Sequence, residues 1–198
     1  MSKTRDMLID VARHLFAREG VENTTMNDIA KASKKGRRTL YTYFKNKNEI
    51  YSAVVETELT HLVSGLRGIT SLVMPADEKL VRYIFQRMEA VKEAVFRNGT
   101  LRAEFFRDIW EVEKVRRRFD EQEIEILKSI LNQGVSEGLF VIPSVEVSAL
   151  TLHYSLRGLD VPYIRGVFTE LGITRFTLRE YILDLVFNGI KKSNPTKH

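Results

Sequence analysis

The sequence predicts an all-α protein of about nine helices, with three short helices preceding a larger helical bundle. Apolar residues recur at the spacing of one helix face, as Leu8, Val11, Ala12 and Leu15 do near the start. The 198 residues include four prolines, and alternating strand-like patterns are scarce. Hydrophobic residues make up 43% of the chain, which is enough for a core and argues against disorder.

Residues that start or stop helices bound the expected elements. Three capping-box patterns mark helix starts: Thr25 with Asp28, Asn46 with Glu49, and Thr177 with Glu180. The expected helices span about 3–19, 25–33, 37–43, 46 to before Pro75, 76–97, 100–110, 112–138, 144–157 and 177–192. The stretch 157–174 contains three glycines and Pro162, so it is a long connection or contains a short extra helix.

Basic residues are concentrated in one short part of the chain. Seven lysines and arginines lie from Lys31 to Lys47 without an acidic residue, whereas acids and bases nearly balance elsewhere and the net charge is +5. Such a run is most often a solvated face. This run also contains Tyr41, Tyr43 and Phe44, which a solvating tail would not hold. Contact with an anionic polymer such as DNA is therefore the favoured interpretation.

The third expected helix has the residues of a DNA-recognition helix. Arg37, Arg38 and Thr39 lie at its N-terminus, where a helix in the major groove presents hydrogen-bond donors to the bases. A guanidinium that pairs bidentately with guanine contributes about 1–3 kcal/mol of discrimination. Thr42 and Tyr43 follow one turn later, where hydroxyl groups reach phosphates.

Four further residues complete the expected DNA-contacting set. Thr25 and Lys47 lie at helix starts, where free N–H groups and a side chain can share one phosphate. Lys35 lies in the turn before the recognition helix. Tyr41 fits core packing and phosphate contact equally well.

The run from Ile9 to Val55 resembles the DNA-binding domain of the tetracycline-repressor (TetR) family. The matching pieces are ARHLFAREG, TTMNDIA, TLYTYFKNK and the helix that follows, and they cover about the first quarter of the chain. The resemblance implies a regulator of transcription that binds double-stranded DNA, with repression as the default. The missing cysteines, signal peptide and membrane-spanning run lead us to expect a cytoplasmic protein. It implies phosphate contacts by Thr25, Thr42, Tyr43 and Lys47 and base reading by Arg37, Arg38 and Thr39.

One departure from the family lies between the second and third helices. The family has a Gly-Val-Ser turn where this chain has Lys34, Lys35 and Gly36. The resemblance implies a left-handed backbone at Lys34, which would cost on the order of 1 kcal/mol in a non-glycine residue. Gly36 is a weaker cap than serine. We expect an altered sequence preference rather than lost DNA binding.

Residues 1–48 are expected to form the DNA-binding domain, and residues 49–198 a helical domain for ligand sensing and dimerisation. The resemblance implies an apolar cavity there for a small apolar or amphipathic ligand. The candidate lining residues are Phe85, Met88, Phe106, Trp110, His153 and Tyr154. Apolar residues at helical spacing fit a packed core just as well, and a structural role is at least as common for a histidine.

The family's usual dimer interface corresponds to the last two long helices, 144–157 and 177–192. The apolar residues that would be buried between two copies are Leu150, Leu156, Tyr181, Leu185 and Phe187. A pair of helices that packs only within its own chain would show the same pattern. A homodimer through these two helices is nevertheless the expected assembly.

Several other classes of protein are disfavoured. The chain has no cysteine, which excludes disulfides and thiolate metal sites. No signal peptide and no apolar run near the roughly 20 residues of a membrane span are present, so no membrane partner is expected. Common catalytic motifs are missing and the four histidines are scattered, so we expect no enzyme, cofactor or metal site. A sequence-neutral DNA-binding protein would share the basic run but would not need arginines at one helix start.

Overall fold

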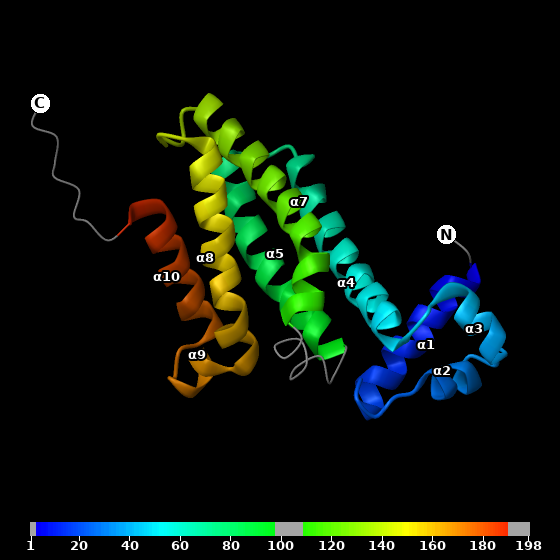
Figure 1. Cartoon of the computed structure of the whole chain (residues 1–198). Helices are drawn as coiled ribbons and strands as arrows, with labels where there is room; N and C mark the ends of the chain where they lie inside the picture. The colour runs from blue at the N-terminus through cyan, green and yellow to red at the C-terminus, as the bar shows by residue number, and fades with distance from the viewer. Residues whose placement is uncertain (1–2, 98–108, 190–198) are drawn as a thin grey trace, which may run out of the picture.

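The computed structural model describes residues 3–97 and 109–189, with the side chains of 109–114 left out. Within these ranges the chain forms nine helices and no strand, which confirms the all-α prediction (Figure 1). They are α1 (Lys3–Glu19), α2 (Met26–Ala32), α3 (Arg37–Tyr43), α4 (Lys47–Thr70), α5 (Ala76–Arg97), α7 (Ile109–Ser136), α8 (Val145–Arg165), α9 (Val167–Glu170) and α10 (Arg175–Asn188). The helix expected over 100–110 falls almost entirely outside the described residues.

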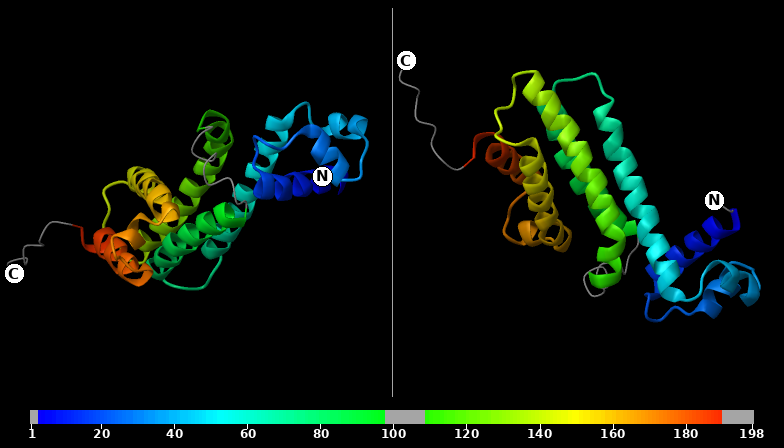
Figure 2. Two further views of the ribbon diagram at one scale, coloured as in Figure 1. Left: turned by 90° about the horizontal axis from the view of Figure 1, so that it is seen from below. Right: turned by 45° about the horizontal axis from the view of Figure 1, so that its top comes forward.

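The helices form a small N-terminal head, α1–α3, and a larger helical body. Figures 1 and 2 place the head at one end of α4 and place α8 and α10 on the opposite side of the molecule. Helix α4 packs against α1 in the head and against α5 and α7 in the body, so it is the element that joins them. Among the described residues, no helix is apolar over enough of its length to cross a membrane. The domain division at residues 48 and 49 stays a prediction.

The head is held together by apolar residues from each of its helices. Leu8 and Phe16 on α1, Ile29 on α2 and Leu40 on α3 are almost fully buried, and Ile50 at the start of α4 closes the cluster. The capping box expected at the start of α2 is present, because the Thr25 hydroxyl accepts from the Asp28 amide and the Asp28 carboxylate accepts from the Thr25 amide. These hydrogen bonds hold the pKa of the Asp28 carboxyl below its usual value.

The structure corrects the predicted end of α8. The helix was expected to stop near residue 157, but it continues through Pro162 to Arg165. A proline inside a helix disturbs the carbonyl four residues earlier, here that of Gly158, whose backbone adapts most readily. Burial of Asp160 and Ile164 favours the added turns, and the helix ends at Gly166 with a φ of +79°. The short extra helix expected in this stretch is α9.

The start of the last helix also differs from its prediction. Thr174, not Thr177, is the N-cap, and its hydroxyl accepts a hydrogen bond from the Thr177 amide at 3.1 Å. Helix α10 therefore begins at Arg175 and ends at Asn188, before the expected residue 192. Both threonines have the chemistry of a cap, so the capping box predicted from sequence was one turn too late.

A buried network of charged residues joins α5, α7 and α8 in the centre of the body. The Arg87 guanidinium, 1% exposed, donates to Glu123 at 2.7 Å and to both Asp160 oxygens at 2.7 and 3.1 Å. The Tyr83 hydroxyl donates to Glu123 at 3.2 Å. Burial by itself would lower the pKa of Arg87, but the two adjacent carboxylates raise it above its usual value.

Candidate nucleic-acid interface

Helix α3 turns its two arginines outward because its apolar residues are anchored inside the head. Leu40 is 0% exposed, and Phe44, which ends the helix, is also buried. Arg37 and Arg38 in the first turn are exposed, and their side chains make no hydrogen bond or ion pair with the rest of the described chain. Both guanidinium groups are therefore available to an external acceptor.

The two threonine hydroxyl groups expected to contact phosphate already donate hydrogen bonds inside the head. Thr42 Oγ1 donates to the carbonyl of Arg38 at 2.9 Å, and Thr25 Oγ1 donates to the Asp28 carboxylate at 2.5 Å. Each hydroxyl has one proton, so donation to a phosphate would require rotation of the side chain. Tyr41 is 44% exposed, which favours surface contact over core packing. Thr39 and Tyr43 are partly buried.

Lys47 has an internal role that the sequence did not reveal. Its Nζ donates to the carbonyls of Val21 at 2.6 Å and Glu22 at 3.2 Å, in the loop between α1 and α2. This ties the first turn of α4 to the head. An ammonium group has three donors, so one remains for the predicted phosphate contact. The Lys47–Val21 hydrogen bond joins residues 26 positions apart, so no local sequence pattern predicts it.

The turn between α2 and α3 has the left-handed residue that the sequence led us to expect. Lys34 has a φ of +53°, the one positive φ outside glycine in the described residues. The Lys34 amide donates to the carbonyl of Lys31 and the Lys35 amide to that of Ala30, both at 3.1 Å. This pair of hydrogen bonds is a Schellman motif, in which glycine is the usual residue at the position of Lys34.

Replacing Lys34 by glycine is expected to stabilise the protein by about 1 kcal/mol. Glycine adopts this backbone conformation without the steric cost of a Cβ atom. The midpoint of urea denaturation should rise with an unchanged slope. Gly68→Ala in α4 is the reverse substitution for comparison. Gly68 has helical backbone and open space for a Cβ atom, so there the change away from glycine should stabilise the protein. A lower stability of Lys34→Gly would show that the lysine side chain makes a stabilising contact.

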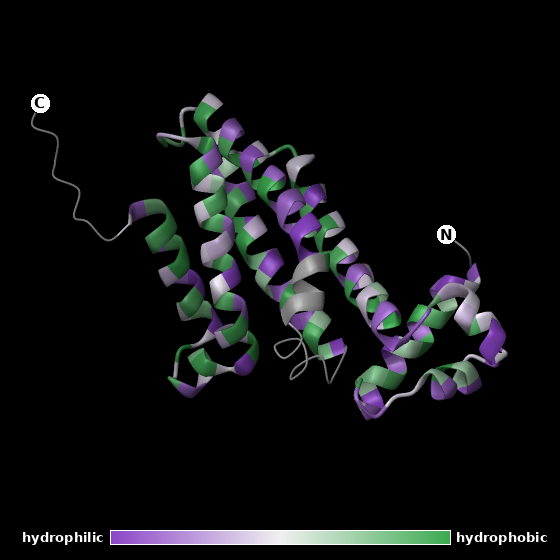
Figure 3. Ribbon diagram, viewed as in Figure 1, coloured by the Kyte–Doolittle hydropathy of each residue, from purple (hydrophilic) through white to green (hydrophobic). Residues whose placement is uncertain are grey.

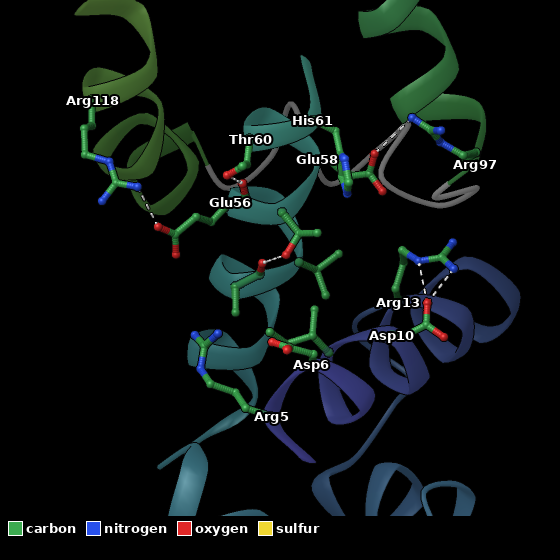
Figure 4. Close-up of a pocket in the computed structure, with 14 residues that line it drawn as sticks. Arg5, Asp6, Asp10, Arg13, Glu56, Glu58, Thr60, His61, Arg97 and Arg118 are labelled. Carbon is green, nitrogen blue, oxygen red and sulfur yellow. Dashed lines mark hydrogen bonds and ion pairs between the residues drawn. The ribbon is translucent and has the colours of Figure 1, made fainter. Parts of the chain in front are cut away.

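A cleft of about 820 Å³ lies between the head and the body (Figure 4). Helix α1 supplies Arg5, Asp10 and Arg13, and α4 supplies the opposite wall with Glu56 and Glu58. Asp10 pairs with Arg13 at 2.7 Å within the head.

Ion pairs from the body reach the α4 wall of this cleft. Arg118 on α7 contacts Glu56 at 2.9 Å, and Arg97 on α5 contacts Glu58 at 3.2 Å. Both glutamates lie on the stretch of α4 that faces α1 across the cleft.

The described ligand candidates occupy different environments. Phe85 lines a groove of about 530 Å³ with Arg82, Arg175 and Arg179. Met88 and His153 are buried, with His153 Nε2 3.2 Å from the Asp120 carboxylate, and Tyr154 is 53% exposed on α8. Neither this groove nor the cleft beside α1 is lined by Met88, His153 or Tyr154. The side chain of Trp110 and the whole of Phe106 lie outside the described residues.

Comparisons with known proteins agree with this picture of the head. Residues 8–54 match the family model described as bacterial regulatory proteins, tetR family. The HTH-type transcriptional regulator YhgD of Bacillus subtilis (strain 168) is 24% identical over 153 residues, which cover 75% of this chain and 78% of the relative. The HTH-type transcriptional regulator AcrR of Shigella flexneri is 39% identical over 54 residues, which cover 27% of this chain and 25% of the relative.

Solved structures extend the likeness of fold over nearly the whole chain. A regulator of the TetR/AcrR family from Thermobifida fusca superposes with a TM-score of 0.72 at 22% identity, covering 96% of this chain and 100% of the other. FadR of Bacillus subtilis, solved in complex with stearoyl-CoA, gives 0.71 at 20% identity, covering 94% and 99%. These relatives are transcriptional regulators, a non-enzymatic class. The N-terminal head therefore contains the DNA-binding domain described as bacterial regulatory proteins, tetR family, and the chain as a whole has the fold of transcriptional regulators that contain this domain.

Proposed function

We propose that the protein is a repressor that binds a palindromic operator as a homodimer and leaves it when a ligand binds the body. Sequence-specific binding is proposed from the first turn of α3, where Arg37 and Arg38 are exposed and their side chains have no partner in the part of the chain that the structure describes. The N-terminal residues of a recognition helix contact base edges in the major groove. Two such guanidinium groups suit guanine.

Selection of random duplex DNA by the purified protein tests the operator. We expect an inverted repeat whose half-sites lie about one helical turn, or a multiple of it, apart, since a two-fold dimer presents two identical heads. Tight binding without an enriched motif would instead identify a sequence-neutral DNA-binding protein. A single enriched half-site would contradict the dimeric operator.

The proposed dimer rests on apolar residues that one copy of the chain leaves exposed on α8 and α10. Figure 3 colours much of α10 as hydrophobic, yet only Leu178 and Ile182 of this helix are buried. We call the exposed set the α8–α10 face: Val147, Tyr154, Phe176, Tyr181, Leu185 and Phe187. Large apolar side chains left exposed on neighbouring helices are typical of a protein–protein interface.

Glutamates within the α8–α10 face are expected to convert the dimer to monomers. Tyr181 and Leu185 are 70% and 57% exposed and lie one helical turn apart. Tyr181→Glu with Leu185→Glu would place four carboxylates in a two-fold interface without partners, which costs several kcal/mol. Analytical ultracentrifugation measures the change.

Val73→Glu is the matched control, because Val73 is fully exposed in the loop between α4 and α5, outside this face. It should leave the dimer intact. A double variant that stays dimeric would place the interface elsewhere.

Stearoyl-CoA is the first ligand to test, because it is the molecule bound by FadR of Bacillus subtilis in a similar fold. The proposed coupling runs through the ion pairs that bind α5 and α7 to α4, Arg97–Glu58 and Arg118–Glu56. A coupling of about 1–3 kcal/mol would weaken operator binding 5- to 150-fold.

Titration of the protein–operator complex with stearoyl-CoA measures the coupling, and free coenzyme A and stearate are the controls. Release by stearoyl-CoA alone supports an acyl-CoA ligand. Binding of stearoyl-CoA without any change in operator affinity would contradict this coupling.

A further inference from the structure

The backbone at Lys34 is less favourable than the same turn would be with glycine. Its φ of +53° lies in the left-handed region, where the Cβ atom of an L-residue approaches the following carbonyl group. The side chain is exposed and makes no hydrogen bond, ion pair or ring contact with the rest of the described chain. No described contact of the Lys34 side chain therefore stabilises the folded state. Residues held in such backbone conformations are concentrated at functional sites.

The charged residues next to Lys34 along the chain are all basic. Lys31, Lys35, Arg37 and Arg38 are exposed, and none of their side chains forms an ion pair within the described ranges. The nearest carboxylate along the chain before them, Asp28, is occupied by the amide and hydroxyl of Thr25. Among the residues that the structure describes, no carboxylate forms an ion pair with the Lys34 ammonium, which is thus open to an external anion.

The position of Lys34 determines which anion it can meet. It lies three residues before Arg37 in the α2–α3 turn, at the end of the molecule opposite α8 and α10 (Figure 1). When the first turn of α3 enters the major groove, the preceding turn lies at the groove edge, where the phosphates run. Lysine suits this contact because its flexible stem carries a compact charge.

We propose that Lys34 contacts the DNA phosphate backbone beside the recognition helix, and that its charge is retained there at the expense of the stability of the turn. The inference rests on DNA binding by the head, but not on a particular operator, dimer or ligand. On this proposal, the lysine that stands where the family has the glycine of Gly-Val-Ser strengthens sequence-independent binding to DNA. Lys35 and Lys31 extend the same positive surface.

The salt dependence of DNA binding tests the proposal. The logarithm of the binding constant falls against the logarithm of salt concentration with a slope near −0.9 for each phosphate contact in duplex DNA. Lys34→Gly should make this slope shallower by about 0.9 for each head engaged, and weaken binding roughly eightfold per head at 0.1 M salt. The probe is a 24-base-pair duplex of random sequence, measured by fluorescence anisotropy with the full chain.

Two variants separate charge from backbone conformation. Lys34→Arg keeps the charge and should keep the slope, whereas Lys34→Asn removes the charge with a residue that tolerates left-handed backbone and should match Lys34→Gly. Arg82→Gln, an exposed cation in the body without an ion pair among the described residues, controls for net charge and should leave the slope unchanged.

The result that would overturn the proposal is a Lys34→Gly variant with the unaltered slope. Equal loss of slope in Lys34→Gly and Arg82→Gln would also overturn it, because the effect would then follow net charge alone. No binding of any duplex by the unaltered chain would overturn both this inference and the proposed function. Weaker binding by a Lys34→Gly protein that is more stable than the parent is the expected combination, and misfolding cannot produce it.

Discussion

Replacing Arg87 by methionine is expected to lower the free energy of unfolding by about 3–5 kcal/mol, the typical cost of breaking a buried ion pair by removing one partner. The guanidinium contacts Glu123 on α7 and Asp160 on α8, and all three side chains are at most 5% exposed. Methionine fills similar volume but removes the cation closest to both carboxylates, and leaves Asp160 with the more distant guanidinium of Arg116 at 3.8 Å. The expected loss comes from buried charge that is poorly compensated rather than from lost packing.

Urea denaturation followed by circular dichroism measures this loss. Arg82→Met on the same helix is the matched control, because Arg82 is exposed and its change should stay within about 0.5 kcal/mol. Adding Glu123→Gln and Asp160→Asn to Arg87→Met should restore part of the stability, since neutral amides tolerate the site better than carboxylates. A cost for Arg87→Met as small as that for Arg82→Met would mean that the carboxylates find other partners.

Replacing Arg37 and Arg38 together by alanine is expected to remove most of the preference for the operator. Each bidentate contact with guanine contributes about 1–3 kcal/mol of discrimination, so the loss of two such contacts should lower the ratio of operator to random-duplex affinity by about 30-fold or more. Both arginines lie in the exposed first turn of α3, and alanine is a good helix former, so the helix itself should remain.

The ratio of the two affinities, measured at one salt concentration, separates base reading from phosphate contact. Lys45→Ala removes an exposed cation just after α3 and should lower both affinities by the same factor. If the double alanine variant also lowers both affinities equally, Arg37 and Arg38 contact phosphates only, and other residues of the head read the bases.

The bounds of α1, α3 and α5 followed from the sequence because local signals determine them. The apolar stripe of α1 repeats at helical spacing and Gly20 stops it, with a φ of +92°. The Thr25–Asp28 box and the Asn46 cap act over three residues, so they too can be recognised without any knowledge of the fold. The left-handed backbone at Lys34 was predicted from the resemblance to the family's Gly-Val-Ser turn, because no local signal in Lys34-Lys35-Gly36 indicates it.

The end of α8 and the role of Lys47 needed the tertiary structure. Burial of Asp160 and Ile164 outweighs the disturbance of the helix at Pro162. Helix propensities describe single residues and do not include this tertiary burial, so they could not predict the longer helix. Lys47 was assigned to phosphate from its position at a helix start, but its partners lie in a loop 25 and 26 residues away.

The sequence by itself determined the helical class, the head and the outward arginines of α3. Periodicity, helix caps and charge runs are local signals, so each can be recognised within a short stretch of the chain. Only the tertiary structure decided that Arg87 would meet Glu123 and Asp160, which are 36 and 73 residues further along the chain. Each of these residues alone fits an ordinary exposed helix position. Burial makes their pairing obligatory, since a charge removed from water must find an opposite charge, and burial depends on how α5, α7 and α8 pack.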